Sequence, residues 1–284
     1  MTEEPAPPSQ AVFEAAVDAE ANAKAVAAAT PQAPERSDLA AVHTLEPALR
    51  EPMRQLLASL ADNKYLLGRR YAEWCTGAPK LESAVAAAAM AQDELGHARS
   101  FYPLLRGFTN APNTPNAGAE ARMEDRGWQT APTNAVAYLD TRFEHWSDFI
   151  AANVVLDTAF TTLLNAAVQS PYEPLRQRAA KIVQEESAHW VHGSGWLRRL
   201  ASQPETAPSL EAVFDHAFTW FGRQDDAVLA PLASAAVLTN GPDGLRQQLT
   251  GRLQPLLAEV GAGALLSREL PWQRWDAARR RLGR

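Results

Sequence analysis

The residues in this sequence of 284 residues that are best suited to bind a metal lie in two short elements with the pattern Glu-x-x-His. They run from Glu94 to His97 and from Glu186 to His189. Residues three apart in a helix share a face, so each element directs a carboxylate and an imidazole to the same side. Such ligands suit a first-row transition metal such as iron or manganese. Two of these elements on separate helices of one bundle supply most of a carboxylate-bridged site for two metal ions.

The elements that must position these residues are predicted to be helices. Alanine is abundant and runs of β-branched residues are scarce, which favours helix over sheet. Two helix hairpins joined by one long connection are typical of the ferritin-like four-helix bundle. The predicted fold is therefore all-α, a ferritin-like four-helix bundle with additional C-terminal helices. Its core helices are expected at residues 52–75, 80–107, 141–169 and 173–200.

The remaining segments complete the predicted organisation. Residues 1–40 are rich in alanine and proline and are expected to form a mobile tail. Residues 41–284 are expected to form a single ferritin-like domain. The loop at 110–133 is long for a compact domain, which indicates either a crossover between the hairpins or a functional lid.

Composition excludes several classes of protein. A formal net charge of −6 argues against nucleic acid as the main partner, and the basic run Arg279–Arg281 is interpreted as the solvated end of a helix. The single cysteine, Cys75, excludes an internal disulfide framework and fits a reducing compartment. No apolar run approaches the roughly 20 residues that a membrane helix needs. We therefore expect a cytoplasmic protein without a membrane segment.

Hairpin geometry identifies the partners of the two Glu-x-x-His elements. Residues equally far from the turn of an antiparallel hairpin lie at the same level, because both helices rise about 1.5 Å per residue. Counting back from Pro79 by the 15 residues that separate it from Glu94 leads to Lys64. The same argument around Tyr172 places Asp157 level with Glu186. The second hairpin thus offers Asp157, Glu186 and His189, whereas the first has a lysine where a carboxylate is needed.

Lys64 changes the charge balance of the predicted site. Four carboxylates would neutralise two divalent ions, but here Glu94, Asp157 and Glu186 are opposed by one ammonium group. We therefore predict at most one tightly held metal, on the side of Asp157 and His189, with Lys64 paired to Glu94 or its neighbours. The alternative is a buried polar network in which the lysine replaces the metal outright. A solvated charged helix face is a weaker alternative, because both elements lie within apolar sequence.

The segment from Ala91 to Arg99 resembles the signature of the phenylacetic acid catabolic protein family, the ferritin-like subunits of a multicomponent phenylacetyl-CoA ring-epoxidising oxygenase. The resemblance extends from about Leu56 to Leu200. Motifs such as Glu73-Trp74-Cys75 and Gly195-Trp196-Leu197 are most similar to the C-type, non-catalytic subunit. The two Glu-x-x-His elements are instead similar to the A-type catalytic subunit, which binds a di-iron centre.

The resemblance implies a set of metal ligands and two competing functions. The catalytic subunit has Glu and Asp at the positions of Lys64 and Asp157, so this chain keeps five of six ligand positions: Glu94, His97, Asp157, Glu186 and His189. Either the chain is an oxygenase component that holds one or two iron ions, or it is a structural subunit without metal that stabilises a di-iron partner. No catalytic residue can be assigned.

The expected partners follow from the same resemblance. They are a homologous ferritin-like subunit or a second copy of the chain, a reductase that supplies electrons, and an aromatic acyl-CoA substrate. Iron storage or peroxide detoxification would also fit the fold, but not the long loop or the C-terminal extension.

Overall fold

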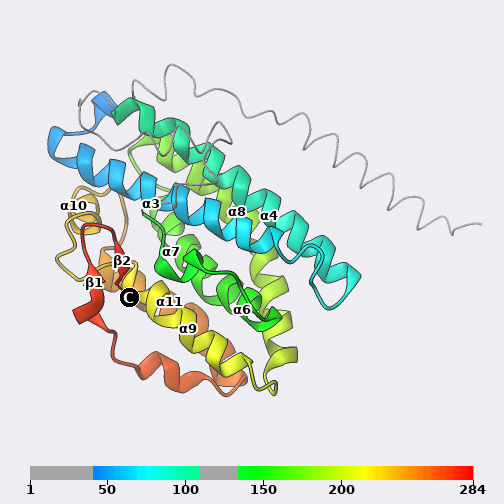
Figure 1. Ribbon diagram of the computed structural model, residues 1–284. Coiled ribbons are helices and arrows are strands. Elements are labelled where there is room, and N and C mark those ends of the chain that lie inside the picture. The colour runs from blue at the N-terminus through cyan, green and yellow to red at the C-terminus, as the bar shows by residue number, and fades with distance from the viewer. Residues whose placement is uncertain (1–40, 109–133, 284) are drawn as a thin grey trace, which may run out of the picture.

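A computed structural model describes residues 41–108 and 134–283 of the chain (Figure 1). The predicted tail at 1–40 and the loop at 110–133 lie outside the described residues. The described part is all-α except for one two-stranded hairpin, which confirms the predicted ferritin-like bundle with additional C-terminal helices. In chain order its elements are the 3₁₀ turn η1 (Ala41–Thr44), α3 (Pro47–Ala72), α4 (Leu81–Phe101), the 3₁₀ segments η2 (Tyr102–Phe108) and η3 (Ala137–Asp140), α6 (Trp146–Ala151), the π-helix η4 (Ala152–Asp157), α7 (Thr158–Ala167), α8 (Glu173–Leu200), α9 (Thr206–Thr219), α10 (Leu229–Ser234), α11 (Pro242–Glu259), the 3₁₀ turns η5 (Gly263–Ser267) and η6 (Trp272–Arg274), and strands β1 (Trp275–Asp276) and β2 (Arg281–Leu282).

The first hairpin, α3 and α4, begins earlier and ends sooner than the sequence predicted. Helix α3 begins at Pro47, where the missing N–H of proline costs no hydrogen bond. Helix α4 stops at Phe101 and continues as the 3₁₀ segment η2, not as α-helix to residue 107. Pro103 explains the change, because proline cannot donate the next hydrogen bond of an α-helix.

The third core helix is composite. Regular α-helix begins at Trp146 and not at residue 141, because the Asp148 carboxylate accepts hydrogen bonds from the backbone of Glu144 and His145 and so caps the helix there. After α6 the chain widens into the π-helix η4 before α7 resumes the α-helical form. Helix α8 has the bounds that the sequence predicted, Glu173–Leu200.

Two glycines allow the helices of each hairpin to approach closely beside the Glu-x-x-His elements. A Cβ on Gly68 of α3 would lie 2.9 Å from the Cβ of Glu94 on α4. A Cβ on Gly193 of α8 would lie 1.9 Å from Oδ1 of Asn153 in η4. A larger residue at either position would force the neighbouring side chain or helix to shift, so both glycines are favoured by packing rather than by backbone conformation.

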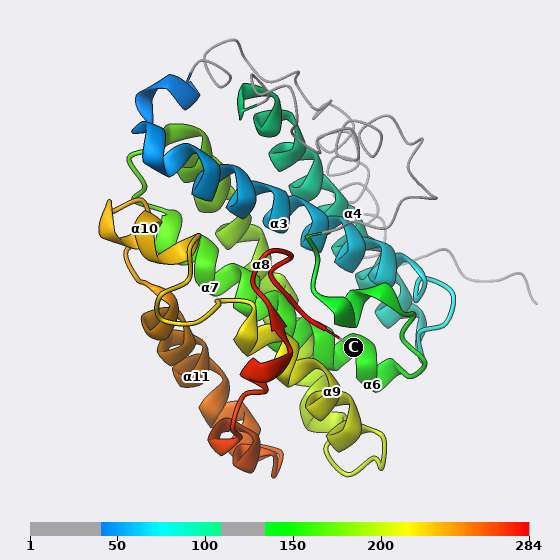
Figure 2. The same cartoon turned by 60° about the vertical axis from the view of Figure 1, so that its left-hand side comes forward.

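The C-terminal helices α9 and α11 lie on one side of the bundle, where α11 packs against α7 and strand β2 packs against α9 (Figures 1 and 2). Here the interpretation of Arg279–Arg281 as a solvated helix end is wrong. The segment belongs to the β1–β2 hairpin, and Arg280 is only 3% exposed, with Nη1 2.5 Å from Oδ1 of Asp226. The buried aspartate compensates the charge, which the sequence alone does not reveal.

The segment Trp146–Ala167 meets the length and composition of a membrane-spanning helix, contrary to the expectation that no such run exists. Of the residues in its most apolar stretch, 89% are buried inside the protein. Its apolar character is therefore explained by the core, where Phe149, Val154 and Phe160 are fully buried.

Candidate functional site: a buried ionic cluster

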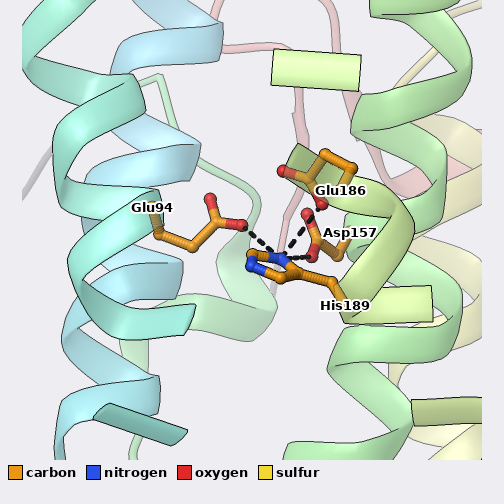
Figure 3. A group of neighbouring side chains, drawn as sticks. All are labelled: Glu94, Asp157, Glu186 and His189. Atoms are coloured by element: carbon orange, nitrogen blue, oxygen red, sulfur yellow. Dashed lines mark hydrogen bonds and ion pairs between the residues drawn. The ribbon is translucent and has the colours of Figure 1, made fainter. Parts of the chain in front are cut away.

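Helices from both hairpins direct ionisable side chains into the centre of the bundle (Figure 3). We call the following residues the central cluster: Lys64, Glu94, His97, Asp157, Glu186 and His189. All six are at most 4% exposed. Figure 3 shows Glu94 from α4 pointing across the interior at His189 of α8, beside Asp157 and Glu186. The structure therefore brings together all five candidate ligands and the lysine that the sequence identified.

Four members of the central cluster have the residue types and spacing of a metal site. Ligand atoms of Glu94, Asp157, Glu186 and His189 all lie within 4.8 Å of one another. Nδ1 of His189 is 3.1 Å from Oδ2 of Asp157 and 3.1 Å from Oε2 of Glu186. The geometry thus retains a carboxylate and imidazole set that could surround a single cation.

The side chain of Lys64 already places a cation among these carboxylates. Its Nζ lies 3.0 Å from the Glu94 carboxylate and 2.7 Å from Oδ1 of Asp157. The third contact, to Oε1 of Glu186, is 2.5 Å long. An ammonium group has three hydrogens, so all of its donors are used. Lys64 reaches further than the sequence suggested, because it pairs with Asp157 of the second hairpin as well as with Glu94 of the first.

The two histidines bridge the hairpins through carboxylates that the sequence analysis missed. His97 of α4 approaches Glu185 of α8 with its Nε2 at 2.8 Å from Oε2. His189 of α8 in turn approaches Asp93 of α4 with its Nε2 at 3.3 Å from Oδ2. The signal was present in the sequence, because each outer carboxylate directly precedes the inner glutamate of its own element.

The pKa values of the three basic groups in the central cluster are all raised. Burial on its own would lower the pKa of Lys64, but the three surrounding carboxylates outweigh it and raise that pKa well above its usual value. Burial likewise opposes protonation of His97, yet hydrogen bonds to Glu185 and Glu94 raise its pKa to about 9. Hydrogen bonds to Asp157 and Asp93 overcome burial and raise the pKa of His189. All three bases are therefore protonated at neutral pH.

The pKa values of the three inner carboxyl groups, Glu94, Asp157 and Glu186, shift in different directions. Burial favours the neutral form of Glu94 and Glu186, but the Lys64 ammonium lowers the pKa of both below its usual value. Burial dominates at Asp157, where repulsion from those two glutamates adds to it and raises the pKa to about 7. The three inner carboxyl groups can carry at most three negative charges, which Lys64, His97 and His189 balance.

This balance decides whether a pair of metal ions fits. The residues present do not fit two divalent ions, because a protonated lysine stands where a sixth ligand is required and holds the remaining carboxylates by hydrogen bonds. A metal would have to displace the ammonium group and remove protons from the imidazoles. The buried carboxylates are neutralised from within the chain.

A pocket of about 460 Å³ connects the surface to the central cluster between α7, α8 and α11. Asp157, Glu186 and His189 contribute to its inner end. At its rim the guanidinium of Arg252 stacks on Trp190 at 4.1 Å from the ring centre. Small solutes thus have a route to the side of the cluster that retains an aspartate.

Comparisons with known proteins agree with the geometry of the bundle. Residues 36–276 match the family model described as phenylacetic acid catabolic protein. The chain is also 27% identical to the C subunit of 1,2-phenylacetyl-CoA epoxidase from Escherichia coli strain K12. That alignment covers 78% of this chain and the whole of the relative.

Proposed function

The chain belongs to the phenylacetic acid catabolic protein family, and we propose that it is the non-catalytic, ferritin-like subunit of a multicomponent oxygenase of aerobic phenylacetate catabolism. Its task is to hold and stabilise a homologous subunit that carries the iron. In this proposal the chain itself binds no tightly held metal, and the aromatic acyl-CoA is oxidised on the partner. The complex works in the cytoplasm and receives electrons from a separate reductase.

The observation that carries the proposal is the position of Lys64. Its ammonium group contacts one carboxylate from α4, one from η4 and one from α8. A cation supplied by α3 therefore ties all four core helices together at their centre. Because an uncompensated buried charge costs several kcal/mol, about 3–5 for breaking such a pair, this lysine is a strong structural constraint. A permanent internal cation suits a scaffold rather than a centre that must exchange ligands.

The surface supports a role in an assembly. Among the described residues, the most exposed large apolar side chains are Leu81, Val85 and Val191, at 79%, 62% and 69% exposure. Leu81 and Val85 are four residues apart on α4 and so share one helix face. The relative from Escherichia coli is named as one subunit of an epoxidase. Together these observations favour a hetero-oligomer.

A second candidate is a chain that holds a single divalent ion, such as iron, on the side of Asp157 and His189. The compact set of four ligand residues favours it, as does the pocket that leads to them. This function requires the Lys64 side chain to leave Asp157 and Glu186. The two candidates differ in the metal content of the chain purified alone.

Co-expression with an A-type subunit of the same family tests the proposal. We expect the two chains to elute together in size-exclusion chromatography, with an iron content that the partner alone explains. Glu186→Gln in this chain should then leave the iron per complex unchanged. Elution of both chains as monomers would contradict the structural role, and loss of iron on Glu186→Gln would favour the second candidate.

A further inference from the structure

A second concave region lies where the loop after α9, the first turns of α11 and the C-terminal segment meet. It is an open pocket of about 480 Å³, within the size range of roughly 300–1,000 Å³ that is usual for small-molecule sites. We call it the Trp272 pocket. It shares no residue with the central cluster, and its lining consists of Arg223, Gln224, Asp225, Arg246 and Trp272.

Two guanidinium groups flank the indole of this pocket. The guanidinium carbon of Arg223 lies 5.5 Å from the centre of the Trp272 ring, and that of Arg246 lies 5.2 Å from it. Arg246 also donates to the carbonyl of Gly222 and pairs with Asp243. Within the described ranges the side chain of Arg223 has no ion pair or hydrogen bond besides this stacking, and only its backbone carbonyl accepts one, from Asp226, so its guanidinium N–H donors are available to a ligand.

The loop that carries Arg223 is held in place. Gly222 has a φ of 73°, a conformation that favours glycine, and a Cβ there would lie 2.2 Å from Oδ2 of Asp226. Asp226 in turn accepts hydrogen bonds from Arg280 at 2.5 Å and from the backbone of Leu229 at 2.8 Å. The pocket is therefore preorganised, which lowers the entropic cost of binding.

The lining selects among anionic ligands. Guanidinium groups recognise phosphate oxygens through charge-assisted, often bidentate hydrogen bonds. Trp272 is only partly buried, and the part of its ring that the two guanidinium groups leave exposed offers a surface for an aromatic base. Asp225 would repel a simple inorganic anion, but it can accept a hydrogen bond from a sugar hydroxyl or an amino group. This combination fits a phosphorylated nucleoside better than free phosphate.

A neighbouring pocket extends the site. It has a volume of about 500 Å³, shares Arg246 with the Trp272 pocket, and is lined in part by Phe214, Phe218, Leu266 and Leu270. A ligand with a phosphorylated nucleoside at one end and a long, less polar arm would occupy both pockets. A coenzyme A thioester has this form.

We propose that the Trp272 pocket binds the phosphorylated adenosine end of a coenzyme A thioester, with adenine on Trp272 and phosphate oxygens on Arg223 and Arg246. The choice of coenzyme A over other nucleotides rests on the proposed function, whereas the nucleotide site itself rests on the geometry of the pocket. The chain would thus contribute to substrate capture without contributing to the oxidation.

Isothermal titration calorimetry of the full chain with adenosine 3′,5′-bisphosphate and with coenzyme A tests this directly. Both should bind, and Arg223→Gln should weaken both by about tenfold or more, as expected for a lost charge-assisted contact. Arg199→Gln is the matched control, because Arg199 is also exposed and stacks on an indole, at 5.4 Å from the centre of Trp196, but lines neither pocket. It should change the affinity by less than about twofold.

Several results would overturn the proposal. They are no binding of either probe at millimolar concentration, equal effects of the two arginine substitutions, or equal competition by inorganic phosphate. Adenosine 5′-diphosphate binding as tightly as coenzyme A would overturn the assignment to coenzyme A. Because these titrations use the chain alone, their failure is distinguishable from a failure to assemble with an A-type partner, which is scored by chromatography.

Discussion

The two helix hairpins of this bundle repeat one pattern and differ at one decisive position. Each contributes an acidic pair followed by a histidine, Asp93-Glu94 with His97 and Glu185-Glu186 with His189, and each histidine reaches the outer carboxylate of the other hairpin. On the accompanying helix, however, the second hairpin carries Asp157 and the first carries Lys64. That difference converts a ligand set into an ion network that neutralises itself, because the lysine provides the cation that a metal would otherwise supply.

The largest effect on stability is expected when the Lys64 ammonium group is removed. Lys64→Met keeps most of the unbranched apolar stem of the side chain but leaves three buried carboxylates without their shared partner. We expect a loss of about 3–5 kcal/mol in the free energy of unfolding, measured by urea denaturation. Lys80→Met, at an exposed lysine, should cost less than about 0.5 kcal/mol. A loss below about 1 kcal/mol for Lys64→Met would show that the lysine is not the centre of the network.

Removing one carboxylate from each hairpin should lower the free energy of unfolding by unequal amounts. Glu94 is ionised in the folded chain, because Lys64 outweighs its burial and lowers its pKa, so Glu94→Gln should cost about 2–3 kcal/mol. Burial and repulsion raise the pKa of Asp157 to about 7, so Asp157→Asn removes a charge that is only partly present at neutral pH. Its cost should be smaller, about 1 kcal/mol. Equal losses in denaturation at pH 7 would contradict this order.

Each hairpin has one glycine at a tight helix contact and one in open space, so substitutions at these four positions test the packing of the two hairpins. Gly193 and Gly68 stand at tight helix contacts, whereas a Cβ added to Gly195 or Gly96 would meet no atom within 4 Å. Gly193→Ala and Gly68→Ala should therefore destabilise by about 1–3 kcal/mol, with the larger effect at Gly193. Gly195→Ala and Gly96→Ala should instead stabilise by about 0.5–1 kcal/mol, because alanine favours helix. Thermal melts of the four variants suffice to rank them.

The smallest expected effect is a change in how the free energy of unfolding depends on pH. The pKa of His97 rises from its usual 6.5 to about 9, because hydrogen bonds to Glu185 and Glu94 outweigh burial. A raised pKa contributes stability that is complete below pH 6.5 and is lost as the pH rises through about 9. Glu185→Gln should reduce this fall, seen as a flatter plot of unfolding free energy against pH between 6.5 and 9. An unchanged slope would mean that Glu185 does not hold the proton on His97.

The sequence predicted the fold and the members of the cluster, because both depend on local periodicity and on the level of residues within a hairpin. The bounds of α8 were found as predicted, and Lys64 lies beside Glu94. What depends on tertiary contacts was not predicted. The sequence around Asp157 gives no sign of the π-helix that ends there. The sequence around Arg280 likewise gives no sign of its pairing with Asp226.

Metal content per chain, measured by elemental analysis of the protein purified alone and of Lys64→Glu, tests the central claim most directly. If the lysine takes the place of a metal, the unmutated chain should hold less than about 0.2 iron ions after incubation with Fe²⁺, and Lys64→Glu should hold about one to two. Asp157→Ala in the Lys64→Glu background should abolish this gain. Two iron ions in the unmutated chain, or no gain in Lys64→Glu, would contradict the account.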